Sequence, residues 1–152
     1  MALTLAGCDR SRPSSQPAAP AAPAAPTVQY IPRADNSPQR PFAEAVRVGN
    51  MLYLSGQLGD SAGKIVPGGI EAETRRTLEN IKAALERNGS SLDNVVKCTA
   101  MLADMSEWPA MNAVYATYFT KHYPARSAFG TTGLALGARM ELECMATVDA
   151  PL

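Results

Sequence analysis

The stretch Arg139-Met-Glu-Leu-Glu-Cys-Met-Ala-Thr-Val148 decides the fold of this 152-residue chain. Apolar residues recur along it at every second position, which is the period of a β-strand whose successive side chains point to opposite faces of a sheet. One face is apolar throughout and holds Met140, Leu142, Cys144, Ala146 and Val148. The opposite face mixes charge with apolar surface and holds Glu141, Glu143, Met145 and Thr147. The strand therefore needs a core on one side only.

A second strand shows the same division between its two faces. In residues 95–102 the apolar side is formed by Val96, Cys98, Ala100 and Leu102, which leaves Lys97, Thr99 and Met101 on the other. Two interpretations of this mixed face stay open. It is either the solvated face of an antiparallel sheet, or a subunit interface that encloses a wet cavity.

The segments between these strands predict a β-hairpin and one long helix. Residues 42–48 and 51–55 alternate on either side of the turn Gly49-Asn50 and predict the hairpin. A short strand is expected at Lys64 to Val66. Residues 71–88 change to a helical period, and Asn88-Gly89 marks the end of that helix.

A second helix and one more strand complete the predicted order of elements. Ser106 is the expected N-cap of the helix, and Pro109 is tolerated in its first turn. The apolar stripe of this helix is predicted to pack inward before Tyr123-Pro124 ends the helix, and it comprises Trp108, Met111, Tyr115, Tyr118 or Phe119, and His122. A strand from Arg126 to about Thr132 follows. The sequence thus predicts an α+β domain, in which two helices bury one face of one mixed sheet.

The first forty residues differ in character from the rest. Leu5-Ala6-Gly7-Cys8 resembles the lipobox of bacterial lipoproteins, with Cys8 as the lipidated residue, although only seven residues precede it. Proline then recurs at every third position from 17 to 26, which favours an extended spacer. We expect a residual signal-peptide end at 1–8, a flexible tether at 9–40 and a folded domain at 41–152.

This beginning bears on location in the cell. With a genuine lipobox behind a truncated start, the protein is a membrane-anchored lipoprotein of the periplasm. Without one, it is cytoplasmic. No stretch of the sequence approaches the roughly 20 apolar residues of a transmembrane helix.

The charge of the domain disfavours a nucleic-acid partner. Four of the 14 basic and two of the 14 acidic residues fall in the first forty positions, which leaves ten basic and twelve acidic residues in the remainder. Proteins that bind nucleic acid normally gather Lys and Arg on one surface to displace counterions from phosphates. We therefore expect no nucleic-acid partner.

The sequence also disfavours metal, disulfide and triad chemistry. The three cysteines are widely spaced, so Cys98 and Cys144 are interpreted as buried, inert thiols and no zinc cluster is expected. A catalytic triad needs a base, and the single histidine, His122, lies near the end of a helix stripe. The expected chemistry requires neither a metal ion nor a cofactor.

Six blocks of sequence resemble successive signatures of the Rid (YjgF) family, in family order across residues 42–149. They comprise Ala45–Asn50 with Tyr53–Gln57, Leu78–Ile81, Val95–Thr99, Asn112–Tyr115 with Phe119, Pro124–Ser127 and Glu141–Ala146. The resemblance implies a chorismate-mutase-like fold. It further implies a homotrimer with three sites between subunits, which would account for the mixed sheet face.

The resemblance also implies a reaction and the residues that perform it. The reaction is hydrolysis of 2-imino or 2-enamino acids to 2-keto acids and ammonia. Arg126 corresponds to an arginine that binds the substrate carboxylate, a role suited to the paired donors of a guanidinium. Glu143 corresponds to a carboxylate that positions the attacking water. Both are catalytic candidates.

Other pocket positions implied by the resemblance include three departures from the family pattern. Ser55 and Gly56 are expected near the substrate, Asn112 in the pocket wall, and the Ala128 backbone N–H near the carboxylate. Phe42 stands where many family deaminases have tyrosine, Ala128 where cysteine is common, and Ala135 where a proline is usual.

Two alternatives to the enzyme are kept, because Phe42 and Ala128 alter the pocket. The first is a trimer that binds small carboxylates without turnover, as a sensor or sequestering protein. The second is a holdase-like chaperone.

Overall fold

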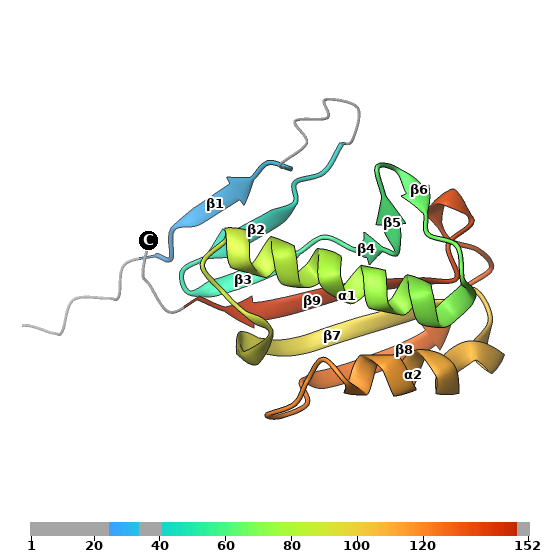
Figure 1. Ribbon diagram of the computed structural model, residues 1–152. Helices are drawn as coiled ribbons and strands as arrows, with labels where there is room; N and C mark the ends of the chain where they lie inside the picture. Colours follow the sequence, from blue (N-terminus) through green and yellow to red (C-terminus); the bar gives the residue numbers. More distant parts are fainter. Residues whose placement is uncertain (1–24, 34–40, 149–152) are drawn as a thin grey trace, which may run out of the picture.

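The strand that opened the sequence lies in the middle of the sheet. A computed structural model describes residues 25–33 and 41–148 (Figure 1). In it β9 (Met140–Thr147) pairs with β3 (Met51–Leu54) and β4 (Gln57–Leu58) on one side and with β7 (Val95–Leu102) on the other. The predicted alternation is confirmed, because buried and half-buried residues alternate along the whole of β9.

The sheet is mixed, and its strand order is β1-β2-β3-β9-β7-β8. The pairs from β1 (Val28–Ile31) through β2 (Ala45–Val48), β3 and β9 to β7 are antiparallel, whereas β7 and β8 (Ala125–Gly130) run parallel. A separate small hairpin joins β5 (Asp60–Ser61) to β6 (Lys64–Ile65). The α+β fold with a mixed sheet is thereby confirmed.

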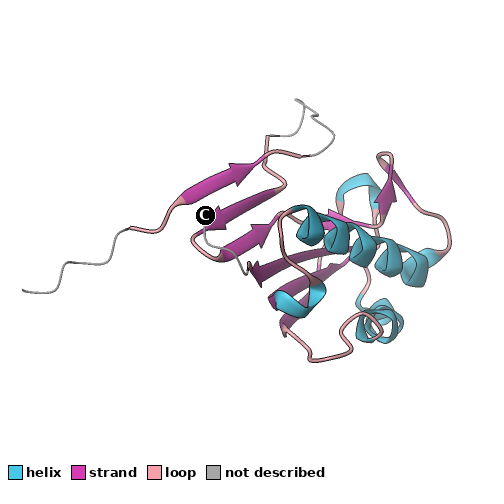
Figure 2. Cartoon of the chain, turned by 60° about the vertical axis from the view of Figure 1, so that its left-hand side comes forward, coloured by secondary structure: helices cyan, strands magenta, loops and turns pink. Residues whose placement is uncertain are grey.

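Both helices cover the same face of the sheet (Figure 2). Helix α1 (Gly69–Arg87) buries Leu78, Ile81 and Leu85 against it, close to the predicted bounds. Helix α2 (Trp108–Ala116) follows a short 3₁₀ turn at Met105–Glu107, and another 3₁₀ turn lies at Leu92–Asn94. A third, Ala135–Gly137, precedes β9.

The prediction for the second helix is wrong at both ends. Ser106 is not the N-cap of α2: that position is Glu107, whose side chain makes no capping hydrogen bond. Asp104 instead caps the preceding 3₁₀ turn, where its carboxylate accepts a hydrogen bond from the Ser106 backbone N–H at 2.8 Å. The helix ends at Ala116, so His122 lies beyond it and is exposed. The stripe still marked residues that pack inward, because Phe119 is buried just after the helix.

The tether and the strand at residue 95 also need correction. β1 lies inside the predicted tether and pairs with β2, so that prediction is wrong for Val28–Ile31. In β7 the register shifts between Val95 and Lys97, so Val95 is buried and Val96 is 42% exposed, the reverse of the predicted order. The predicted lipid site Cys8 lies outside the described residues.

The two cysteines of the domain form a disulfide rather than the predicted free thiols. Cys98 on β7 and Cys144 on β9 are direct cross-strand partners with Cα atoms 4.1 Å apart, and both are buried beneath the helices. The strand pattern placed each on an apolar face correctly. Spacing along the chain could not show that the two strands are neighbours in this register.

Candidate functional site

Arg126 lies on the edge strand β8 and points toward α2. Its Nη2 donates a hydrogen bond of 2.6 Å to Oδ1 of Asn112, the residue expected in the pocket wall. Its Nη1 is buried and has no hydrogen-bond partner among the described residues. None of the ion pairs found in that part of the chain involves Arg126. The guanidinium therefore has no described carboxylate paired with it and retains one N–H donor that a ligand could use.

Two aromatic rings that sequence reasoning assigned only to packing hold this guanidinium. Its Cζ lies 4.4 Å from the ring centroid of Tyr115 and 5.8 Å from that of Trp108, within the range of cation–π attraction. Burial raises the pKa of Tyr115 to about 12, so its hydroxyl stays protonated. That hydroxyl is buried without a described partner. A sequence signal existed, because the helical spacing of 108, 112 and 115 puts these residues on one face.

A hollow of about 370 Å³ opens beside this guanidinium. Its walls come from the second half of α2, the following turn and the start of β8, and comprise Asn112, Tyr115, Ala116, Tyr123, Pro124 and Arg126. Ala128 lies two residues further along β8, half-buried against the core. We call Asn112, Tyr115, Arg126 and Ala128 the arginine cluster.

Glu143 lies on the other face of the sheet from Arg126. Arg126 is the register partner of Cys98, which faces the helices, whereas Glu143 is the partner of Thr99 and faces away from them. Glu143 lines a smaller hollow of about 120 Å³ together with Tyr53, Lys97 and Met145. Within one chain the two predicted catalytic residues therefore do not share a pocket.

Glu141, which sequence reasoning did not single out, makes the closest approach to Gly56. A Cβ atom added to Gly56 would lie 2.8 Å from the carboxyl carbon of Glu141, so a larger residue at this position would force the Glu141 side chain to move. Burial, and then the charge of Glu143, raise the pKa of Glu141 above its ordinary value. The signal was available, since both glutamates occupy the same face of β9, but alternation could not tell which one reaches Gly56.

Ser55 directly precedes Gly56, and Phe42 directly precedes Ala43, the residue to which the Ser55 side chain is hydrogen-bonded. The Ser55 hydroxyl donates to the backbone carbonyl of Ala43 at 2.8 Å, and its N–H donates to that of Glu44 at 2.9 Å. Phe42 precedes Ala43, is 49% exposed and has the Arg33 guanidinium 6.0 Å from its ring centroid. We call Phe42, Ser55, Gly56, Glu141 and Glu143 the glutamate cluster.

The arginine cluster and the glutamate cluster are separated by the sheet itself. β7 lies between β8 and β9, and neighbouring strands are about 4.8 Å apart. The face that carries the glutamates also exposes apolar side chains on β3 and β8, where Tyr53 is 40% and Phe129 47% exposed. Charged and apolar groups thus share a face that no element of this chain covers in the described residues.

Two further searches of the described residues concern metals and membranes. Nowhere in residues 25–33 and 41–148 do three or more His, Cys, Asp or Glu side chains gather as ligands for a metal ion. Across the same ranges, neither helix combines the length and apolarity that crossing a bilayer requires.

The fold and the clusters define a class of small α+β proteins with a half-buried arginine at a sheet edge and carboxylates on an open face. Within that class the chain belongs to the family described as Endoribonuclease L-PSP, whose pattern matches residues 33–148. This is the Rid (YjgF) family that the sequence resembles, so that prediction is confirmed.

Curated relatives and solved structures agree on this membership. The chain is 42% identical over 114 residues to the 2-iminobutanoate/2-iminopropanoate deaminase of Capra hircus, a match that covers 74% of this chain and 82% of that protein. It superposes on yeast Mmf1 with a TM-score of 0.73 at 33% identity, covering 81% of this chain and all of the other. The YjgF gene product of E. coli gives 0.70 at 30% identity, covering 78% and 98%.

Proposed function

We propose that this protein is a hydrolytic deaminase that converts 2-imino or 2-enamino acids into 2-keto acids and ammonia. The observation that carries the proposal is the half-buried Arg126, whose Nη1 lacks a partner and whose charge meets no described carboxylate. A substrate carboxylate would supply both. The relative from Capra hircus is named for this activity and is 42% identical to the present chain over 114 residues.

The reaction balances with water as the only co-substrate. Arg126 binds the carboxylate through parallel hydrogen bonds and fixes the position of the iminium carbon. A glutamate accepts a proton from water as the oxygen bonds to that carbon. The same carboxyl then returns that proton to nitrogen and the C–N bond breaks with its electron pair on nitrogen. The departing ammonia takes up the remaining hydroxyl proton and leaves as ammonium while the C=O bond forms.

Two glutamates are candidates for this proton transfer. Glu143 is the residue that the family resemblance predicts, and it faces a small hollow on the open side. Glu141 touches Gly56 and has a raised pKa, which suits a group that must both accept and donate a proton. We propose that one of the two positions the water.

A complete site in this proposal needs two chains. The arginine cluster and the glutamate cluster lie on opposite faces of one sheet, so Arg126 of one subunit meets a glutamate of its neighbour. A homotrimer would create three such sites and would cover the exposed Tyr53 and Phe129. The exposure of that mixed face supports the assembly, because single chains rarely leave contiguous apolar surface open to solvent.

The test of turnover uses an amino-acid oxidase to generate imines and semicarbazide to trap them. We expect the protein to reduce the amount of trapped imine and to release ammonia at an increased rate. Equal trapping with and without the protein, for several amino acids, would leave the non-catalytic carboxylate binder or the holdase-like chaperone as its function. The same comparison tests whether a pocket that has Phe42 and Ala128, and so lacks the usual tyrosine hydroxyl and cysteine thiol, still hydrolyses imines.

We further propose that the protein acts in an oxidising compartment as a lipoprotein anchored through Cys8. Two independent features support this: the Leu5-Ala6-Gly7-Cys8 lipobox and the Cys98–Cys144 disulfide, since disulfides persist mainly outside the reducing cytosol. Mass spectrometry of the protein from its native host should find an acyl group on Cys8. An unmodified Cys8 would favour the cytoplasmic alternative.

A further inference from the structure

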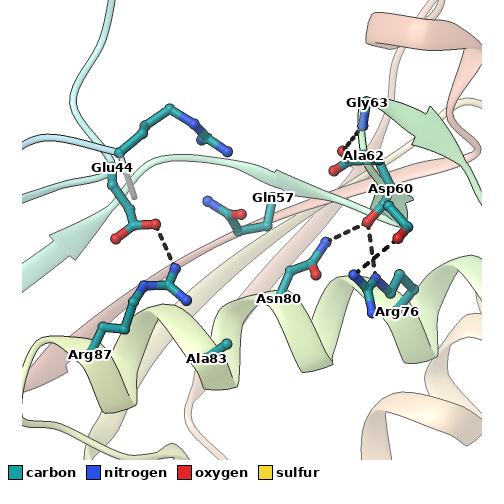
Figure 3. A pocket seen from close by; sticks show the side chains of 11 residues that line it. Glu44, Gln57, Asp60, Ala62, Gly63, Arg76, Asn80, Ala83 and Arg87 are labelled. Atoms are coloured by element: carbon teal, nitrogen blue, oxygen red, sulfur yellow. Dashed lines mark hydrogen bonds and ion pairs between the residues drawn. The ribbon is translucent and has the colours of Figure 1, made fainter. Parts of the chain in front are cut away.

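A polar hollow that shares no residue with either cluster lies on the helix side of the molecule. It has a volume of about 450 Å³ and is lined by α1 together with β4, β5 and the turn after β5 (Figure 3). We call it the α1 hollow. Arg76, Asn80, Ala83 and Arg87 line it along one side of the helix, because residues three and four apart share a helix face.

The opposite wall of the hollow supplies two carboxylates and one amide side chain. Glu44 is only 5% exposed and forms an ion pair of 2.6 Å with Arg87, while Gln57 is 8% exposed. Asp60 directs one carboxylate oxygen to the Gly63 N–H at 3.2 Å. Glu44 is therefore paired with a cation of the protein itself, and Asp60 is hydrogen-bonded through one of its two carboxylate oxygens.

Arg76 is left with a charge that no described carboxylate balances. Its Nε donates to the Asp60 carbonyl at 3.0 Å and its Nη2 lies 3.4 Å from the Ser61 hydroxyl, both uncharged acceptors. Its other terminal nitrogen makes no hydrogen bond in the described part of the chain. A guanidinium held in place from one side and open on the other is suited to an anion.

The remaining groups of the hollow restrict the chemistry of that anion. Asn80 uses its amide N–H groups on the carbonyls of Leu58 and Asp60, which leaves its carbonyl oxygen as an acceptor. The Ser61 hydroxyl can donate or accept. No aromatic side chain lines the hollow among the described residues, so there is no surface on which a nucleobase could stack.

We infer that the α1 hollow binds a small hydroxy-carboxylate, with its carboxylate on Arg76 and its hydroxyl groups on Ser61 and Asn80. The volume lies within the range of small-molecule sites. This site is distinct from that of the proposed deaminase, whose arginine lies on β8. A bound ligand would bridge α1, through Arg76 and Asn80, to the β5–β6 hairpin, through Ser61.

The test is a titration of the ¹⁵N-labelled full-length protein with glycerate, followed by amide NMR shifts. We expect saturable shifts at Gly63, Asn80 and Ala83 in the wild type and in Arg126→Ala. Ala83→Glu should abolish them by placing a carboxylate in the hollow. Lys82→Glu is the matched control, because it changes the net charge by more but lies on an exposed position outside the hollow.

Three results would overturn the inference. They are the absence of saturable shifts at these amides, shifts that persist in folded Ala83→Glu, and shifts that disappear in Arg126→Ala. Inorganic phosphate provides a further arm, since binding of phosphate without glycerate would contradict the hydroxy-carboxylate class. If Ala83→Glu does not fold, Arg76→Gln tests the same wall and should also lose the shifts.

Discussion

Arg126 combines a half-buried position, two aromatic neighbours and one donor that has no partner among the described residues. The cost of burying such a charge is reduced by Asn112 and by the face of Tyr115, yet neither supplies a negative charge. A residue in this state gains most from an anionic ligand that fits its two terminal nitrogens. Its geometry matters as well as its charge.

Arg126→Lys should therefore impair the deaminase although it keeps the charge. Loss of a charge-assisted hydrogen bond costs about 1.5–3 kcal/mol, which corresponds to a decrease of about 10- to 100-fold in kcat/KM. Steady-state kinetics on enzymatically generated imines measures it. Arg75→Lys, an exposed position on α1, is the control and should be silent. Wild-type kcat/KM in Arg126→Lys would contradict the role of the guanidinium.

Glu141 and Glu143 can be distinguished by isosteric amides. Because Glu141 touches Gly56, we expect Glu141→Gln to abolish turnover and Glu143→Gln to reduce it less, mainly through the lost effect of its charge on Glu141. Single-turnover rates at several pH values provide the comparison. The reverse ranking would return the role to Glu143, and two fully active variants would refute a carboxylate mechanism.

The free energy of unfolding should also depend on whether Glu141 is protonated. Its pKa is raised in the folded state, so the folded protein binds this proton more tightly than the unfolded chain does. The free energy of unfolding must therefore fall as the pH rises from the ordinary glutamate pKa through the raised one. Urea denaturation across this window should show a smaller fall in Glu141→Gln. The exposed Glu86→Gln should behave as the wild type, and an identical fall in all three proteins would contradict the shift.

Residue identities were predictable only as far as sequence patterns reach. Resemblance to the family pointed to Arg126 and Asn112, which the structure places in contact. Alternation assigned Glu143 to the open face, but it assigned Glu141 to the same face. Only the path of the chain at Gly56 distinguishes them. Tyr115 and Trp108 were regarded as packing residues, since a helix period cannot reveal what an aromatic face touches.

At the scale of elements, periodicity predicted α1, β7 and β9 well because each has one strongly apolar side. Periodicity failed where a bulge, flanking prolines or a capping residue determines the local backbone. The bulge at Val96 exchanges the buried and exposed positions at the start of β7. β1 was missed because its four residues lie between prolines and bury little surface. The predicted cap, Ser106, lies inside the 3₁₀ turn that Asp104 caps, and α2 begins only after this turn.

The disulfide joins two central elements and should contribute substantially to stability. It closes a loop with a sequence separation of 46 residues, for which chain-entropy arguments give about 4 kcal/mol. Reduction should therefore lower the free energy of unfolding by about 2–4 kcal/mol, measured by denaturation with and without reductant. Cys8→Ser should leave this difference unchanged. Equal midpoints, or three reactive thiols in the non-reduced protein, would contradict the bond.

For the whole molecule, the order of strands explains why the arginine cluster and the glutamate cluster do not meet within one chain. β8 forms one edge and carries Arg126 toward α2, while β9 carries both glutamates toward the uncovered face. The sequence predicted the mixed character of that face but left solvent and subunit contact open, because alternation says nothing of what lies opposite. Assembly as a trimer is the proposal that lets the two clusters meet.

Subunit mixing tests this account most directly. Inactive Arg126→Ala and inactive Glu141→Gln (or Glu143→Gln, if that variant is the inactive one) are unfolded together in equal amounts and refolded, and imine hydrolysis is measured. If each site takes its arginine from one subunit and its glutamate from the next, random cyclic trimers should regain about a quarter of wild-type activity. Activity no higher than that of the separately refolded variants would contradict a site shared between chains.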